Sequence, residues 1–238
     1  MARRNYVLVH GAWHGGWCWR HVAGRLREAG HAVFTPTLTG LGERRHLLHE
    51  GITLDTFVQD IANVLQSEEL RDVYLVGHSF GGRVACGVAD RLRACLRRLV
   101  LLDAGLPEPG KAAWDALPAD VREARLADVR AAGQGGAIPP PPAQAFGVAD
   151  PHAAAWLARR LTPHPLGAYT TPLQLSNPLG NGLPVTYIRC TAPAYGPIAD
   201  SAAQARARTD WQYLELATAH DAMVTAPDAL ARMLLELD

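Results

Sequence analysis

Short runs of apolar residues recur along the chain, and each run is followed by a stretch in which apolar residues have helical spacing. The runs are not polar at alternate positions, which is typical of parallel strands that are covered on both faces. This alternation predicts a doubly wound, mainly parallel sheet. The expected strands are residues 6–10, 32–36, 73–77, 99–103, 185–190 and 211–216, and the expected helices are residues 17–29, 54–65, 82–92 and 226–237.

The region between the fourth and fifth strands breaks this rhythm. Residues 104–183 are rich in proline, including the run from Pro139 to Pro142, with helical pieces at 119–131 and 151–161. We therefore expect a core made of residues 1–103 and 184–238, and a helical cap inserted at 104–183. The insertion leaves the carboxyl end of a central strand, which favours a cap over a site rather than decoration at the edge of the sheet. Four cap aromatics either line the pocket or form a small core of the cap: Trp114, Phe146, Trp156 and Tyr169.

The segment Gly77-His78-Ser79-Phe80-Gly81-Gly82 carries the strongest chemical signal. It has the pattern G-x-S-x-G between a predicted strand and a predicted helix, which is the context of a nucleophile elbow. Glycines are needed there because the turn is too sharp for side chains on either side of the serine. The motif predicts an α/β-hydrolase fold with about six strands, in which Ser79 is the nucleophile.

Other residues fit the remaining parts of such a site. His220 follows the last strand, where a loop can bring it to Ser79 as the base. The backbone amides of Ala12, after the first strand, and of Phe80, after the serine, are the expected oxyanion donors. His14 and His78 are expected to line the substrate pocket. The remaining candidates are expected to be solvated: His31, His46, His49, His152 and His164.

Three segments carry a resemblance to a known family. The opening Val7-Leu8-Val9-His10-Gly11-Ala12-Trp13-His14-Gly15-Gly16-Trp17, the loop Thr39-Gly40-Leu41-Gly42-Glu43-Arg44 and the elbow resemble plant methylesterases, hydroxynitrile lyases and salicylate-binding esterases. The likeness is strong over about the first 105 residues, faint in the cap and present again from Pro184. It implies cofactor-free chemistry on small, mostly apolar esters, and it supports the assignments of Ser79, His220, Ala12 and Phe80.

The chain departs from this family where the catalytic aspartate is expected. Ala192 occupies that position, after the fifth strand. Asp103 is the best substitute, because it ends the strand between the nucleophile strand and the one that normally precedes the acid; capping of the following turn is the alternative. Asp200 is a weaker candidate, and Asp221 is too close in sequence to His220 to bond its ring.

Composition adds limits on partners and location. The chain has 238 residues, of which 48% are hydrophobic and 19% charged, and its formal net charge is zero. These values indicate neither nucleic acid nor a membrane as a partner. The four cysteines are scattered without a framework and are expected to be reduced, so the cytoplasm is the expected location.

The sequence thus predicts a serine hydrolase that cleaves an ester, thioester or lactone of a small to medium hydrophobic molecule, with no cofactor and no metal. Two alternatives remain open. One is a lyase or cyclase on the same fold, although Asp221 stands where the hydroxynitrile lyases have a lysine. The other is a binding protein with poor turnover, which only the missing aspartate supports. A homodimer is compatible with the sequence, which leaves the oligomeric state and the substrate undecided.

Overall fold

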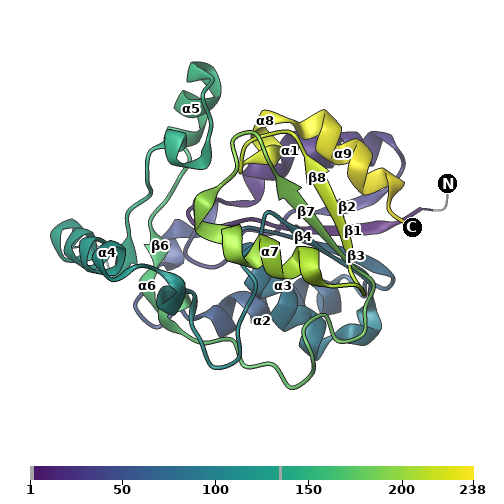
Figure 1. The fold of residues 1–238 in the computed structure, drawn as a ribbon, viewed down its shortest axis with the longest axis horizontal. Coiled ribbons are helices and arrows are strands. Elements are labelled where there is room, and N and C mark those ends of the chain that lie inside the picture. Colours follow the sequence, from purple (N-terminus) through teal and green to yellow (C-terminus); the bar gives the residue numbers. More distant parts are fainter. Residues whose placement is uncertain (1–2, 134–135) are drawn as a thin grey trace.

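The computed structural model describes residues 3–133 and 136–238. Its centre is a parallel sheet of six strands in the order β2-β1-β3-β4-β7-β8 (Figure 1). This topology confirms the predicted fold class. The strands are β1 (Asn5–Val9), β2 (Ala32–Phe34), β3 (Val73–His78), β4 (Leu96–Leu102), β7 (Val185–Cys190) and β8 (Gln212–Leu216).

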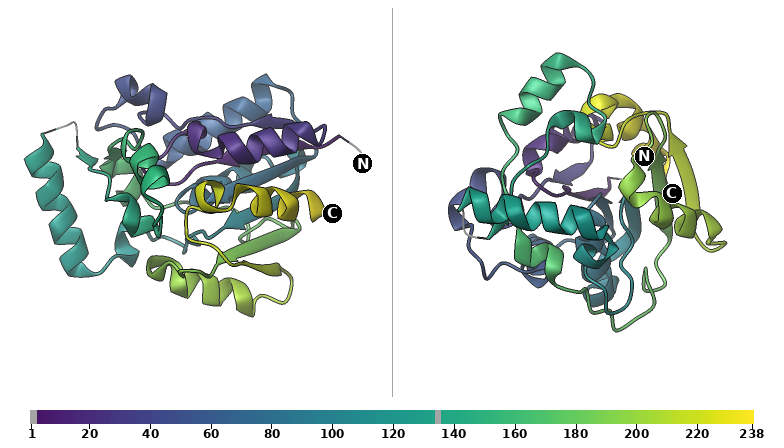
Figure 2. Two further views of the ribbon diagram at one scale, coloured as in Figure 1. Left: turned by 90° about the horizontal axis from the view of Figure 1, so that it is seen from above. Right: turned by 60° about the vertical axis from the view of Figure 1, so that its left-hand side comes forward.

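Helices cover both faces of the sheet. Successive residues of a strand point to opposite faces, so Tyr6 and Leu8 of β1 pack with helices α1 and α9, while Val7 and Val9 pack with α2 and α3. Figure 2 shows the sheet between these layers. The helices are α1 (Arg20–Glu28), α2 (Leu54–Ser67), α3 (Gly81–Arg91), α7 (Ala199–Ala207), α8 (Ala222–Thr225) and α9 (Pro227–Glu236). Short 3₁₀ helices in the core are η1 (Gly16–Trp19), η2 (Gly42–Leu47), η3 (Arg93–Cys95) and η6 (Gly196–Ile198).

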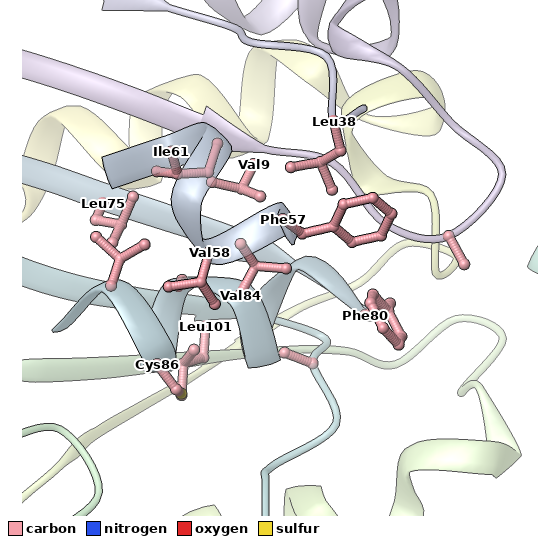
Figure 3. Packing of buried hydrophobic residues seen from close by; sticks show 14 of the residues in the cluster. Val9, Leu38, Phe57, Val58, Ile61, Leu75, Phe80, Val84, Cys86 and Leu101 are labelled. Atoms are coloured by element: carbon pink, nitrogen blue, oxygen red, sulfur yellow. The ribbon is translucent and has the colours of Figure 1, made fainter. Parts of the chain in front are cut away.

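Helix α2 shows how the apolar spacing becomes packing. Phe57, Val58 and Ile61 lie on one face of the helix and are fully buried. Burial of each such side chain contributes about 1.5–3 kcal/mol. Figure 3 shows this face packed with residues of the sheet (Val9, Leu75 and Leu101), of α3 (Val84 and Cys86) and of two connecting segments (Leu38 and Phe80).

The register of the central strands brings three carboxyl ends to one edge. His78 of β3 is paired with Leu102 of β4, and Leu102 is paired with Ile188 of β7. The residues that follow β3 and β4, Ser79 and Asp103, therefore leave the sheet at the same level. Carboxyl ends of parallel strands are the usual place for a site in such folds.

The inserted segment lies outside the sheet, at the end opposite the two chain termini (Figure 1). It leaves after β4, which ends at Leu102, and the chain returns to the sheet with β7, which begins at Val185. Its function as a cap that selects substrates stays a prediction. Its elements are η4 (Ala113–Ala116), α4 (Ala119–Ala132), β5 (Ala137–Ile138), η5 (Ala143–Phe146), α5 (Pro151–Ala158), β6 (His164–Pro165) and α6 (Leu166–Thr170), with β5 and β6 antiparallel.

Strand β4 and helix α7 show where the apolar pattern was a poor guide. Strand β4 begins at Leu96, three residues earlier than predicted, because Arg97 and Arg98 interrupt the apolar run that marks it in the sequence. Helix α7 was not expected, since its sequence ADSAAQARA has small and polar residues but no broad apolar stripe. It buries only the small side chains of Ala202 and Ala205. In the described part of the chain, no helix is long and apolar enough to cross a membrane.

The close approach of α3 to the segment after β4 generates the first prediction. A Cβ atom on Gly82 would lie 2.5 Å from the Cβ atom of Ala104, whereas a Cβ atom on Gly24 in α1 would meet nothing within 4 Å. Gly82→Ala should lower the free energy of unfolding by about 1–3 kcal/mol through overpacking. Gly24→Ala should raise it by about 0.5–1 kcal/mol, because alanine favours the helix. Urea unfolding of both variants tests this, and equal effects of the two substitutions would contradict the packing.

Candidate active site

Ser79 lies on a strained turn between β3 and α3. Its φ is 53°, in the left-handed region that non-glycine residues rarely adopt. The flanking glycines make this turn sterically feasible. A Cβ atom on Gly77 would lie 2.6 Å from the carbonyl oxygen of Gly81, and one on Gly81 would lie 2.4 Å from that of His10. The backbone therefore holds the Ser79 hydroxyl at the start of α3, where the helix dipole favours negative charge.

A continuous chain of hydrogen bonds runs from Ser79 to Asp103 through His220. The Ser79 Oγ lies 2.9 Å from Nε2 of His220, and Nδ1 of His220 lies 2.7 Å from Oδ2 of Asp103. A carboxylate can only accept a hydrogen bond, so in the neutral ring Nδ1 carries the hydrogen and Nε2 is free to accept from the serine hydroxyl. This is the tautomer that a general base for Ser79 requires.

Asp103 is fully buried, and donors saturate its carboxylate. Oδ1 accepts hydrogen bonds from the Arg189 guanidinium at 2.9 Å and from the Cys190 amide at 3.0 Å. Together with His220, three donors surround its two oxygens. Arg189 and Cys190 both belong to β7, so the strand that precedes Ala192 holds the Asp103 carboxylate.

The other positions weighed for this role lie elsewhere. Ala192 is exposed in the loop after β7, where its amide bonds the carbonyl of Thr218 at 2.9 Å. Asp200 is exposed in the first turn of α7. Asp221 is fully buried, and its Oδ2 bonds His14 rather than His220. The structure thus brings Asp103 alone of these candidates to the ring of His220.

The two expected oxyanion donors flank Ser79. Phe80 is the residue before α3, and Ala12 lies in the turn after β1, the neighbour of β3 in the sheet. A Cβ atom on Gly11 would lie only 3.0 Å from the Cβ atom of Ser79, so this turn lies against the serine. Within the described residues, neither amide donates a hydrogen bond. Both amides are therefore available for a ligand oxygen.

His14 forms a buried ion pair with Asp221. Its Nε2 lies 3.0 Å from Oδ2 of Asp221, and its Nδ1 lies 2.8 Å from the carbonyl oxygen of Ala12. Both partners are hydrogen-bond acceptors, so both ring nitrogens donate and the imidazole is charged. Burial opposes this charge, but the carboxylate outweighs burial and raises the pKa of His14. For Asp221, burial is likewise outweighed by His14, so its pKa is lowered.

His78 contacts the backbone of His220. Its Nε2 donates to the carbonyl oxygen of His220 at 3.0 Å, and burial lowers its pKa well below the usual value, with nearby His220 adding to the shift. His14 and His78 both line a hollow of about 20 Å³ beside Ser79, as expected. Each is only 1% exposed, so their contacts favour positioning of the Ala12 turn and of His220 over direct substrate contact.

The expectation of solvated histidines is wrong for two residues. His46, His49 and His152 are exposed, whereas His31 is 6% exposed and His164 is fully buried. His31 packs edge-on against Tyr6 and accepts from the Arg4 amide at 3.2 Å. His164 lies among aromatic rings, with the Phe80 centroid at 4.9 Å, and burial lowers its pKa strongly. These contacts join segments far apart in the chain.

Two residues that sequence reasoning did not single out complete the site. The ring of Tyr195 stacks on His220 at a centroid distance of 3.8 Å. Arg189 donates both to Asp103 and, at 3.1 Å, to the carbonyl of Tyr195. Arg189 thereby connects Asp103 to the loop whose Tyr195 ring covers His220. Of these two residues, only Arg189 stands out in the sequence, because it is a charged residue within an otherwise apolar strand.

Hollows open on either side of this chain of hydrogen bonds. One of about 100 Å³ reaches Ser79 and Phe80 beneath α4 and α6, and another of about 410 Å³ reaches His220 beside η5. Tyr169 lines the first and Phe146 the second, so these two cap aromatics contact pocket space. Trp156 instead packs edge-on against Trp17, at 5.0 Å between centroids.

One group of side chains has metal-ligand character: His78, His220 and Asp221, whose ligand atoms lie within 4.8 Å of one another. Both ring nitrogens of His220 are already bonded to Asp103 and Ser79. Among the described residues, Nδ1 of His78 and Oδ1 of Asp221 lack a partner. Two donors are fewer than the three or four protein ligands of a zinc site.

Comparison with known proteins places this site in a family context. Residues 6–233 match the model described as "Alpha/beta hydrolase family". The carbendazim hydrolyzing esterase of Nocardioides sp. (strain SG-4G) is 42% identical over 244 residues, covering 98% of this chain and 99% of that protein. Methylesterase 9 of Arabidopsis thaliana is 36% identical over 106 residues, covering 44% of this chain and 41% of the plant protein. These matches confirm the resemblance identified from the sequence motifs.

Solved structures give the same result for the fold. An extracellular alpha/beta-hydrolase from a Paenibacillus species, described as sharing structural and functional homology with tobacco salicylic acid binding protein 2, superposes with a TM-score of 0.85. It is 24% identical and covers 98% of each chain. The polyneuridine aldehyde esterase structure has a TM-score of 0.77 at 21% identity, with 99% of both chains covered. At these identities, the likeness concerns the fold.

The buried His14–Asp221 pair predicts a pH-dependent stability. His14 has a raised pKa, so its contribution is complete below about pH 6.5 and fades as the pH rises through the folded-state value. Asp221 has a lowered pKa, so its contribution is complete above about pH 3.9 and fades as the pH falls through the folded-state value. Asp221→Asn should therefore be most destabilising between these limits, by up to about 3–5 kcal/mol.

Denaturant unfolding from pH 4 to 9 measures this difference. The matched control is Asp228→Asn, which removes an exposed carboxylate paired with Arg25 at 2.7 Å. Because arginine does not titrate in this range, the control should have a small effect that is constant from pH 5 to 8. A pH-independent effect of Asp221→Asn would show that the His14 imidazole is not charged in the folded protein.

Proposed function

Because the chain belongs to the alpha/beta hydrolase family, we propose that it is a serine ester hydrolase that works through an acyl-enzyme on Ser79. The observation that carries this proposal is the unbroken chain of hydrogen bonds Ser79–His220–Asp103 at the end of the sheet. A relative that is similar over its whole length is an esterase, which supports hydrolysis as the reaction class.

In this proposal, each member of the chain of hydrogen bonds has one role. Nε2 of His220 removes the proton of Ser79 as Oγ attacks the carbonyl carbon, and the oxygen of that carbonyl becomes negative. The amides of Ala12 and Phe80 then donate to this oxygen. His220 delivers the proton to the departing alkoxide, an acyl-enzyme remains, and a water activated by the same ring releases the acid.

Asp103 supplies the two things an acid must provide. Its bond to Nδ1 at 2.7 Å fixes the ring and its tautomer, and its charge stabilises the imidazolium that forms in the transition state. Arg189 and the Cys190 amide hold the carboxylate on its other oxygen. Asp103 thus takes the place that the family gives to an aspartate at position 192.

The surroundings of the site indicate a small ester as substrate. The space next to Ser79 is about 100 Å³, and Phe80, Leu117, Tyr169 and Ile198 give it apolar walls. The hollow at His220 is larger, at about 410 Å³, and is open enough to take an alcohol part of varied size. Esters with a compact acyl part and a larger alcohol part fit these two hollows best.

The alternative of a cyanohydrin lyase has less support. Such a reaction needs a cation near the leaving group, and the residue after the base is Asp221, which is already paired with His14. The same intact hydrogen bonds from Ser79 to Asp103 argue against a binding protein without turnover.

Asp103→Asn tests the proposed acid. Asparagine preserves the shape but removes the charge and stabilises the wrong tautomer of His220, so kcat for p-nitrophenyl butyrate should fall by roughly four orders of magnitude with little change in KM. The matched control is Asp200→Asn, which lies on exposed α7 and should retain the wild-type kcat. The double variant Asp103→Asn, Ala192→Asp should recover part of the rate, because it places a carboxylate at the position where the family has its catalytic aspartate. A folded Asp103→Asn protein with near wild-type kcat would leave Ser79 and His220 as a dyad.

A further inference from the structure

The hollow beside Ser79 contains two arginines and no acidic side chain. Arg83, on α3 four residues after Ser79, and Arg125, on α4 of the inserted segment, both line it. Its other polar lining consists of hydroxyl groups, those of Ser79, Tyr169, Tyr195 and Ser201. A chain with zero formal net charge therefore places two positive charges at the wall of a space of about 100 Å³.

Arg83 has no partner for its charge. Its side chain is 6% exposed, and among the described residues it forms neither a hydrogen bond nor an ion pair. Burial lowers the pKa of its guanidinium, with only partial compensation from Cys86, Tyr169 and more distant carboxylates. Arginine nevertheless stays charged at neutral pH. A buried charge without a partner costs free energy that a ligand can recover.

Arg125 reaches the same space from the opposite wall. Its guanidinium stacks over the rings of Trp13 at 5.5 Å and Tyr169 at 5.2 Å. Within the described residues, its Nη1 atom is buried and has no hydrogen-bond partner. The aromatic contacts hold the plane of the guanidinium and leave Nη1 available for a ligand. Both arginines lie near Tyr169, whose pKa burial raises and their charges lower.

We propose that Arg83 and Arg125 bind a carboxylate of the substrate, so that the enzyme acts on esters whose acyl part carries a second, free carboxylate. Guanidinium groups match a carboxylate with paired, charge-assisted hydrogen bonds. The proposal rests on the proposed ester hydrolysis, and it replaces the expectation of a small, mostly apolar ester by a half-ester of a short dicarboxylic acid.

The position of His220 decides which part of the substrate carries the carboxylate. His220 must protonate the leaving alkoxide, so the alcohol part lies on its side, in the hollow of about 410 Å³ that His220 lines. The arginine hollow is lined by Ser79 and Phe80 but not by His220. The acyl part, which stays bonded to Ser79, therefore extends toward the arginines.

The size of the hollow limits the acyl part. A cavity of about 150 Å³ accepts benzene, and this space measures about 100 Å³. A carboxylate and a spacer of two or three methylene groups fit this volume. Half-esters of succinic or glutaric acid are therefore the appropriate probes.

Monomethyl succinate and methyl succinamate test the proposal, because they differ only in a carboxylate against a neutral carboxamide. The wild-type enzyme should prefer the carboxylate in kcat/KM, measured from released methanol. Arg83→Met and Arg125→Met should each reduce this preference by about 10- to 100-fold, the range for a lost hydrogen bond to a charged group. The control is Arg122→Met, which changes an arginine on the same helix α4 outside the hollow and should retain the preference.

Binding to the Ser79→Ala protein separates this proposal from the proposed function. Calorimetry should show tighter binding of monomethyl succinate than of methyl succinamate, and Arg83→Met should abolish the difference. Equal binding of the two esters would overturn the carboxylate site even if both are hydrolysed. Selective binding of monomethyl succinate to Ser79→Ala, without hydrolysis of either ester by the wild-type protein, would support the site and overturn the ester hydrolysis.

Discussion

The carboxylate of Asp103 is the point through which the strands and loops of this site are coupled. It is fully buried at the end of β4 and accepts from three donors, His220, Arg189 and the Cys190 amide. Leaving any of these buried donors or the carboxylate unpaired would be costly. The same bonds therefore fix the loop that carries His220, the end of β7 and, through Arg189, the segment that stacks Tyr195 on the base.

The strand order explains why Asp103 can meet His220 although Ala192 follows β7. Strand β4 lies between β3 and β7, so its carboxyl end also faces His220. Arg189 and Cys190, at the end of β7, donate to the other oxygen of Asp103. Around this centre, two arginines and the His14–Asp221 pair distribute charge in a mostly apolar interior.

The sequence predicted the parts whose causes are local. The Gly77–Gly82 elbow and the position of His220 follow from motifs and periodicity, whereas the choice of Asp103 used the strand order of the α/β-hydrolase fold. Contacts between segments far apart in the chain could not be predicted from motifs or periodicity. Burial of His31 and His164, the stacking of Tyr195 and the pairing of His14 with Asp221 depend on tertiary approach, and Arg125 reaches the pocket through a cap whose sequence has little pattern. Helix α7 lacks the apolar stripe that marks other helices.

We infer that Ser79, His220 and Asp103 act as one unit, and the rate of covalent labelling by a fluorophosphonate probe tests this most directly. Peptide mass mapping should find the label on Ser79, and Ser79→Ala should remain unlabelled. Labelling of Asp103→Asn should be slower by several orders of magnitude, because an unoriented imidazole cannot activate the hydroxyl. Label on another residue, or equally rapid labelling of Asp103→Asn, would contradict the account.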